Sequence, residues 1–100
     1  MALLELTIIP IGTGNPSVGS FIADIGQALE KENLAYQITD MGTIVEGEPA
    51  ELLEIAAGLH ELPFQQGALR VVTQLRIDDR RDKKIHLGDK TAAVQARLKK

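Results

Sequence analysis

Two short β-type runs near the middle of the chain, residues 36–39 and 43–46, are separated by a turn of only three residues. A parallel strand pair needs a crossover of about a dozen residues, so these two runs must pair as an antiparallel hairpin. A strand pattern and then a helix pattern precede the hairpin, and a helix pattern and then a strand pattern follow it. The resulting order, β-α-β-β-α-β, predicts one α+β domain of ferredoxin-like fold, in which two helices cover one face of a four-stranded antiparallel sheet.

The two outer strands are predicted from alternation over residues 2–10 and 69–78. In the first strand, one face carries the apolar residues that we assign to the core under the helices: Leu4, Leu6 and Ile8. The opposite face carries Leu3, Glu5, Thr7 and Ile9. This mixed apolar face has no predicted cover, and large exposed apolar patches mark interaction sites. The sequence therefore predicts a homo-oligomer that assembles through the open face of the sheet.

Two longer helices are predicted from apolar residues at helical spacing. The first begins after Ser17, which is placed to cap it, and Asn33 is placed to end it. The second has Pro49 in its first turn, where the missing N–H costs nothing, and is expected to end at Pro63 and Gly67. A short third helix is expected near the C-terminus, over residues 89–98.

The composition excludes several classes of protein. The 100 residues carry a formal charge of −3, whereas nucleic-acid-binding domains usually carry a basic surface. The lack of cysteine excludes a disulfide framework and a thiolate metal site. No run approaches the roughly 20 apolar residues that span a bilayer, and the N-terminus does not resemble a signal peptide. We therefore expect a cytosolic protein that binds neither nucleic acid nor membrane.

The glycine-rich turn after the first strand has the order of a nucleotide-binding loop. Its glycines, Gly12, Gly14 and Gly19, give G-x-G-x-x-x-x-G instead of G-x-G-x-x-G. Asp40 ends the second strand, about where a ribose-binding acid would lie, but that strand runs directly into a hairpin and no β-α-β-α-β unit exists. We interpret the turn as structural, with anion binding at the helix N-terminus near Ser17 as the alternative.

Few other side chains indicate chemistry. His60 and His86 lack the spacing of metal ligands and are expected to be surface residues. Glu46 lies in mid-strand, where a buried carboxylate needs a partner, and Arg70, Arg76 or a cationic ligand is expected to supply it. The charged run over residues 77–84 follows the last strand. This run is either a solvated surface, a functional loop at the sheet end, or a source of ion pairs between subunits.

Three stretches, residues 8–25, 36–48 and 69–83, carry a family resemblance that covers nearly the whole chain. They are "IIPIGTGNPSVGSFIADI", "YQITDMGTIVEGE" and "LRVVTQLRIDDRRDK", and the last two together are specific. The chain resembles the small ferredoxin-like family of thiamine-binding proteins. The resemblance implies a tetramer of two dimers whose sheets join, with a pocket for thiamine or its hydroxymethylpyrimidine part near a subunit interface. It implies no established catalytic activity, so thiamine is expected as a ligand and no cofactor is expected.

Thiamine joins an aminopyrimidine to a positively charged thiazolium ring, so its site needs hydrogen-bond acceptors and a flat apolar or sulfur-bearing wall. Carboxylates and hydroxyls of the strands offer the acceptors, a methionine offers the wall, and an arginine suits a phosphate ester of thiamine. The expected ligand-binding residues are Glu5, Thr7, Met41, Thr43, Glu46, Asp78 and Arg80. Among these, Glu46 is expected to contribute most.

Two rival functions come from other classes. An acylphosphatase-type enzyme has the same order of elements, but it needs an arginine in the phosphate loop, and residues 12–19 contain none. A structural or regulatory homo-oligomer that senses another metabolite or a protein partner shares every argument about the fold and differs only in its ligand.

Overall fold

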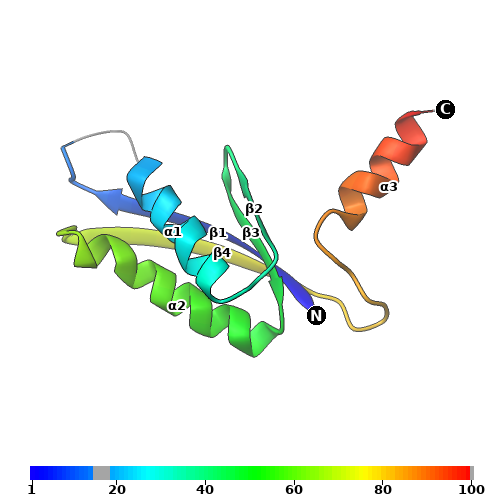
Figure 1. Cartoon of the computed structure of the whole chain (residues 1–100), viewed down its shortest axis with the longest axis horizontal. Helices are drawn as coiled ribbons and strands as arrows, with labels where there is room; N and C mark the ends of the chain where they lie inside the picture. The colour runs from blue at the N-terminus through cyan, green and yellow to red at the C-terminus, as the bar shows by residue number, and fades with distance from the viewer. Residues whose placement is uncertain (15–18, 100) are drawn as a thin grey trace.

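The computed structural model describes residues 1–14 and 19–99 and contains four strands and three helices within them (Figure 1). In chain order the elements are β1 (Ala2–Ile11), α1 (Gly19–Lys31), β2 (Tyr36–Thr39), β3 (Gly42–Gly47), α2 (Pro49–Gln65), β4 (Arg70–Asp79) and α3 (Asp89–Leu98). This order confirms the α+β ferredoxin-like prediction, including the C-terminal helix over residues 89–98. No helix within the described ranges is both long and apolar enough to cross a bilayer.

The sheet has the strand order β2-β3-β1-β4, and every neighbouring pair is antiparallel. β1 lies in the interior of the sheet and pairs with β4 along its whole length, from Ala2 opposite Asp79 to Ile11 opposite Arg70. Its pairing with β3 is shorter and ends at Leu6 opposite Thr43. The hairpin of β2 and β3 therefore leaves β1 halfway along, a divergence that is visible in Figure 1.

The core lies between the sheet and the pair of helices α1 and α2. The expected face of β1 is buried, and Leu4 and Leu6 are among the largest fully buried side chains. The buried cluster consists of Ala2, Leu4, Leu6, Ile8, Ile25, Leu29, Val45, Leu52, Ala56 and Leu59. Because four of the five buried residues of β1 belong to it, the central strand supplies the floor on which both helices pack.

The opposite face of the sheet carries the residues expected there. Leu3, Glu5 and Thr7 are half-buried, and Ile9 is 44% exposed. The register of β4 places Val72 next to Ile9 on this face. No helix covers the face in Figure 1. We call it the open face.

The ends of the helices follow local backbone chemistry. Asn33 has a positive φ of 59°, and the Leu34 N–H donates to the Leu29 carbonyl, which ends α1 as expected. The Ser17 cap lies outside the described residues. Of the two residues expected to end α2, Pro63 does not, because the helix continues to Gln65, whereas Gly67 follows the C-cap with a positive φ of 99°. A proline removes one N–H donor, but the Pro63 carbonyl still accepts hydrogen bonds from Gln66 and Ala68 in the closing turn.

Helix α3 stands apart from the rest of the domain (Figure 1). None of its described residues is buried, and Val94 and Leu98 are 55% and 77% exposed. The loop before it is better anchored, because Ile85 is only 7% exposed. The ferredoxin-like unit is thus complete without α3.

Replacing Leu4 by alanine should lower the free energy of unfolding by about 2–5 kcal/mol, because it opens a cavity in a fully buried site. Urea denaturation measures this change. Leu69→Ala is the matched control, because Leu69 is 94% exposed, and it should change the free energy by less than about 0.5 kcal/mol. Equal effects of the two substitutions would contradict the assignment of the core.

Candidate functional site

A cleft of about 180 Å³ opens where the β2–β3 hairpin leaves β1. The glycine at the start of β3 allows this close approach, because a Cβ at Gly42 would lie 3.1 Å from both the Leu6 carbonyl oxygen and Thr7 Oγ1. The turn itself is held by Thr39, whose hydroxyl accepts from the Met41 and Gly42 N–H groups and donates to the Gly42 carbonyl. The cleft is therefore formed by specific contacts of the hairpin turn. We call it the hairpin cleft.

The hairpin cleft is lined by aliphatic side chains and by a few polar ones. Ile22 and Ile25 of α1 and Ile38 of β2 line the apolar side. The polar groups are the hydroxyls of Thr7 and Thr43, with the Asp40 carboxylate at the turn. An apolar cavity of about 150 Å³ is large enough for one benzene ring. The hairpin cleft thus has room for one six-membered ring.

Two groups around the cleft, the Asp40 carboxylate and the Met41 sulfur, are accessible from its outside. Within residues 1–14 and 19–99, the Asp40 carboxylate has no hydrogen-bond partner, and the Thr43 side chain is only 4% exposed and lies inside the cleft. Met41 is 83% exposed at the mouth of the cleft. The Thr7 hydroxyl makes only a long hydrogen bond of 3.4 Å, to the Met41 carbonyl.

The carboxylates expected on the open face have cationic neighbours. Arg76 Nη2 lies 2.7 Å from Glu5 Oε1, directly across the β1–β4 ladder. Lys90 Nζ lies 3.4 Å from Asp78 Oδ2. These residues border a shallow hollow of about 450 Å³ that is separate from the hairpin cleft. All four groups are substantially exposed, so each pair contributes little to stability.

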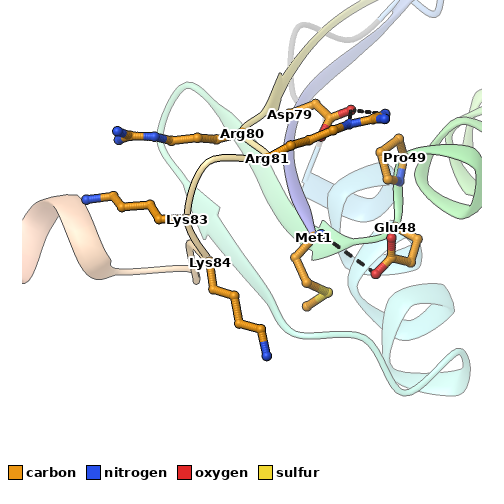
Figure 2. A pocket seen from close by; sticks show the side chains of 8 residues that line it. All are labelled: Met1, Glu48, Pro49, Asp79, Arg80, Arg81, Lys83 and Lys84. Carbon is orange, nitrogen blue, oxygen red and sulfur yellow. Dashed lines mark hydrogen bonds and ion pairs between the residues drawn. The ribbon is translucent and has the colours of Figure 1, made fainter.

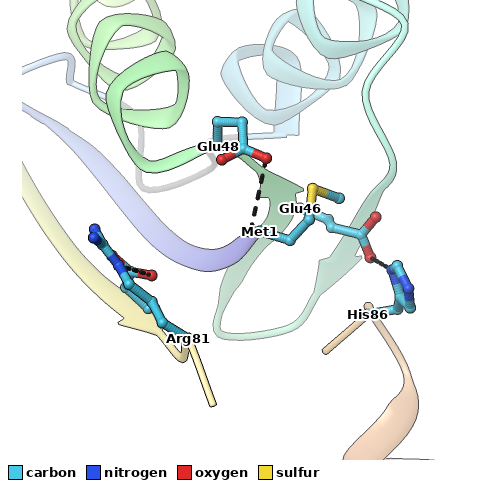
Figure 3. A network of polar contacts seen from close by, with 6 residues as sticks. Met1, Glu46, Glu48, Arg81 and His86 are labelled. Carbon is cyan, nitrogen blue, oxygen red and sulfur yellow. Dashed lines mark hydrogen bonds and ion pairs between the residues drawn. The ribbon is translucent and has the colours of Figure 1, made fainter. Parts of the chain in front are cut away.

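Glu46 has a different partner from the expected arginines. Its Oε1 accepts a hydrogen bond of 2.7 Å from the Leu87 N–H and lies 3.3 Å from His86 Nδ1 (Figure 3). The expectation of Arg76 was wrong because the strand register places Arg76 opposite Glu5. Arg70 was wrong as well, because it lies opposite Ile11 at the far end of β1. Glu46 therefore fastens the loop that leads to α3.

Arg80 lies in a third place, a hollow of about 520 Å³ at the end of the sheet (Figure 2). Its guanidinium pairs with Asp82, at 2.6 Å from Nε to Oδ1, and this hydrogen bond holds the pKa of Asp82 below its usual range. Arg81 likewise pairs with Asp79 and lowers the pKa of that carboxyl. Arg80 and Arg81 point in opposite directions in Figure 2, so the two guanidinium groups do not converge on one anion.

The histidines and the glycine turn have structural surroundings. His60 is half-buried, with Nδ1 2.6 Å from Thr73 Oγ1 and its ring edge-on to Phe64, so it is less exposed than expected. Gly12 and Gly14 both have positive φ, which fits a structural turn. No cluster of His, Cys, Asp and Glu suited to a metal occurs among the described residues.

The structure thus gathers three of the seven expected ligand residues into one cleft: Thr7, Met41 and Thr43. Glu5 and Asp78 lie together elsewhere on the open face, and Glu46 and Arg80 lie at two further places. Sequence reasoning missed Asp40 as a ligand residue. Its position in the hairpin turn, next to Met41, was the available signal.

Comparison with known proteins gives the family. The chain matches the family model described as "Thiamine-binding protein" over residues 4–95. The chain belongs to this family. Membership confirms the resemblance in the sequence, and the family is named for binding and not for a reaction.

Relatives of this thiamine-binding protein family match along almost their whole length. The chain is 46% identical over 102 residues to the UPF0045 protein YqgV of Bacillus subtilis, with 98% of each chain covered. It is 43% identical over 99 residues to a UPF0045 protein of Methanothermobacter thermautotrophicus, covering 98% of this chain and 100% of the relative. The crystal structure of MJ1052 from Methanocaldococcus jannaschii is similar, with a TM-score of 0.82, 31% identity and coverage of 94% and 95%.

Replacing Glu46 by alanine should release the loop before α3, because it removes the acceptor of the Leu87 N–H. We expect faster amide hydrogen exchange at Leu87 and through α3, with the exchange of the buried Val45 amide unchanged. Glu46→Gln is the matched control, because the amide oxygen still accepts a hydrogen bond. If Leu87 exchanges equally fast in the alanine variant and in the parent chain, Glu46 does not anchor this loop.

Proposed function

We propose that this chain binds thiamine, or its hydroxymethylpyrimidine part, in the hairpin cleft and does so without catalysing a reaction. The observation that carries the proposal is an aliphatic slot for one ring that is lined by the buried Thr43 hydroxyl, by the half-buried Thr7 hydroxyl and by the Asp40 carboxylate. Family membership supports the ligand class, since the family is described as thiamine-binding.

The chemistry of the cleft suits both halves of thiamine. The aminopyrimidine ring enters between the isoleucine side chains, where apolar burial favours a flat ring. Its amino group and ring nitrogens pair with the hydroxyls of Thr7 and Thr43, which both donate and accept hydrogen bonds. The thiazolium ring remains at the mouth, where Asp40 neutralises its charge and the Met41 sulfur contacts its face.

The position of Thr7 supports a subunit interface next to the cleft. Thr7 lines the cleft and also belongs to the open face, as does Ile9. A second copy packed on the open face would therefore close one side of the cleft. Assembly through the open face, on which Glu5 and Asp78 also lie, is therefore part of the proposal.

The proposal contains no catalytic step because of the groups that line the cleft. Among its described lining residues, Asp40 is the one titratable side chain, and no histidine, lysine or cysteine is there to activate the threonine hydroxyls. In the proposal, the Asp40 carboxylate beside the cationic ring stabilises the bound ligand electrostatically and takes part in no reaction.

Isothermal titration with thiamine tests the proposal. Saturable binding is expected for the parent chain, with affinity about tenfold or more lower in Asp40→Asn, because a charge-assisted contact is lost. Met41→Ala should also weaken binding while leaving the unfolding free energy unchanged, because Met41 is 83% exposed. Thr43→Val keeps the shape of the side chain and removes only its hydroxyl.

Glu61→Gln is the matched control for charge. Glu61 is exposed on α2 and lines none of the hollows described above, so its removal should leave thiamine affinity unchanged. Comparison at equal oligomeric state separates ligand contacts from assembly. Absence of heat with both thiamine and hydroxymethylpyrimidine would overturn the proposal in favour of a regulatory oligomer with another ligand.

A further inference from the structure

Charge is divided unevenly along this chain. Residues 1–69 contain ten acidic and one basic side chain, whereas residues 70–100 contain four acidic and ten basic ones. The formal charges of the two parts are therefore −9 and +6, which together give the −3 of the whole chain. Opposite charges of this size favour contacts in which the C-terminal part of one copy meets the helix layer of another.

A groove of about 380 Å³ between α1 and α2 lies in the acidic part. Three apolar side chains and three carboxylates line it: Ala28, Ile55, Leu62, Glu32, Glu51 and Glu54. Within the described residues, none of these carboxylates has an ion-pair or hydrogen-bond partner. Gly58 widens the groove, since a Cβ built there meets no atom within 4 Å. The groove combines an apolar floor with unneutralised negative charge.

Helix α3 has the complementary character. Lys90, Val94 and Arg97 follow one another at i, i+4 and i+7, so they share one face of the helix. Leu98 lies beside them, and both apolar side chains of this face are exposed. Lys90 makes only the long, exposed pair with Asp78, which contributes little. This face therefore presents an apolar strip flanked by positive charge.

The helix cannot reach the groove of its own chain. The loop before α3 is fastened to Glu46 through Leu87, and Lys90 lies against Asp78 on the open face. The groove lies between the two helices that cover the opposite face of the sheet (Figure 1). We propose that α3 of one copy docks into the groove between α1 and α2 of a second copy. Reciprocal docking of both helices closes a two-fold dimer.

This contact is independent of the proposed thiamine site. It uses neither the hairpin cleft nor the open face, so its failure would leave the ligand assignment intact. A dimer of dimers requires two different interfaces, and the open face and the exchanged α3 supply two.

Charge reversal on each side tests the docking by analytical ultracentrifugation at low salt. One variant carries Glu51→Lys and Glu54→Lys in the groove, and the other carries Lys90→Glu and Arg97→Glu in α3. Each variant alone should self-associate about tenfold or more weakly than the parent chain, because two attractive pairs become repulsive. All four residues are exposed, and circular dichroism verifies that both variants remain folded.

Mixing the two variants supplies the decisive arm. In the mixed pair each α3 again meets a groove of opposite charge, so the mixture should regain the association of the parent chain, which neither variant reaches alone through the open face. Glu61→Lys, which alters the same helix outside the groove, should leave association unchanged. Failure of the mixture to associate, or loss of association in the α3 variant with none in the groove variant, would overturn the proposal and place α3 elsewhere.

Discussion

The early end of the β1–β3 ladder is the constraint on which the rest of the molecule depends. β1 pairs with β4 over ten residues, but its pairing with β3 stops at Leu6 opposite Thr43. Up to that point the two ladders hold β1 in the interior of the sheet and bury its helix-facing side. Beyond that point the hairpin separates from β1, and the hairpin cleft opens between them. β1 thus contributes to the core along most of its length and also lines the candidate site where the hairpin has left it.

Gly42 and Thr39 fix the geometry of the hairpin at the point where it separates from β1. A side chain at Gly42 would press on the Leu6 carbonyl, so glycine lets the turn begin in contact with β1. The Thr39 hydroxyl then satisfies the backbone groups of the turn, which keeps the hairpin rigid where it has left the sheet. The result is a preformed slot, and preformed slots bind small flat ligands with less loss of conformational entropy.

Periodicity in the sequence predicted the fold because burial repeats with the geometry of each element. Leu4 and Leu6 are buried, and Leu3 and Glu5 lie on the open face, as alternation requires. The partner of Glu46 was not predictable in this way, since His86 and Leu87 are about 40 residues away and reach it through an irregular loop. The pairing of Glu5 with Arg76 depends on strand register, which alternation alone leaves open.

The candidate site was recovered only in part for the same reason. Met41 and Thr43 were chosen for their chemistry, and the divergence of the hairpin brings them together with Thr7. Asp40 was missed as a ligand residue because its role depends on the hairpin cleft, and no local sequence pattern predicts that cleft. The uneven charge of the two parts of the chain is visible in the sequence. Its consequence for assembly could be inferred only once the structure showed that α3 is exposed.

The central claim is that the hairpin cleft holds the ligand. Amide chemical shifts of ¹⁵N-labelled protein, recorded during titration with thiamine, test it most directly. The account predicts that the largest shifts occur at Thr7, Met41, Gly42 and Thr43 and that they saturate together. Shifts confined to the charged run after β4, or to the groove between α1 and α2, would contradict it.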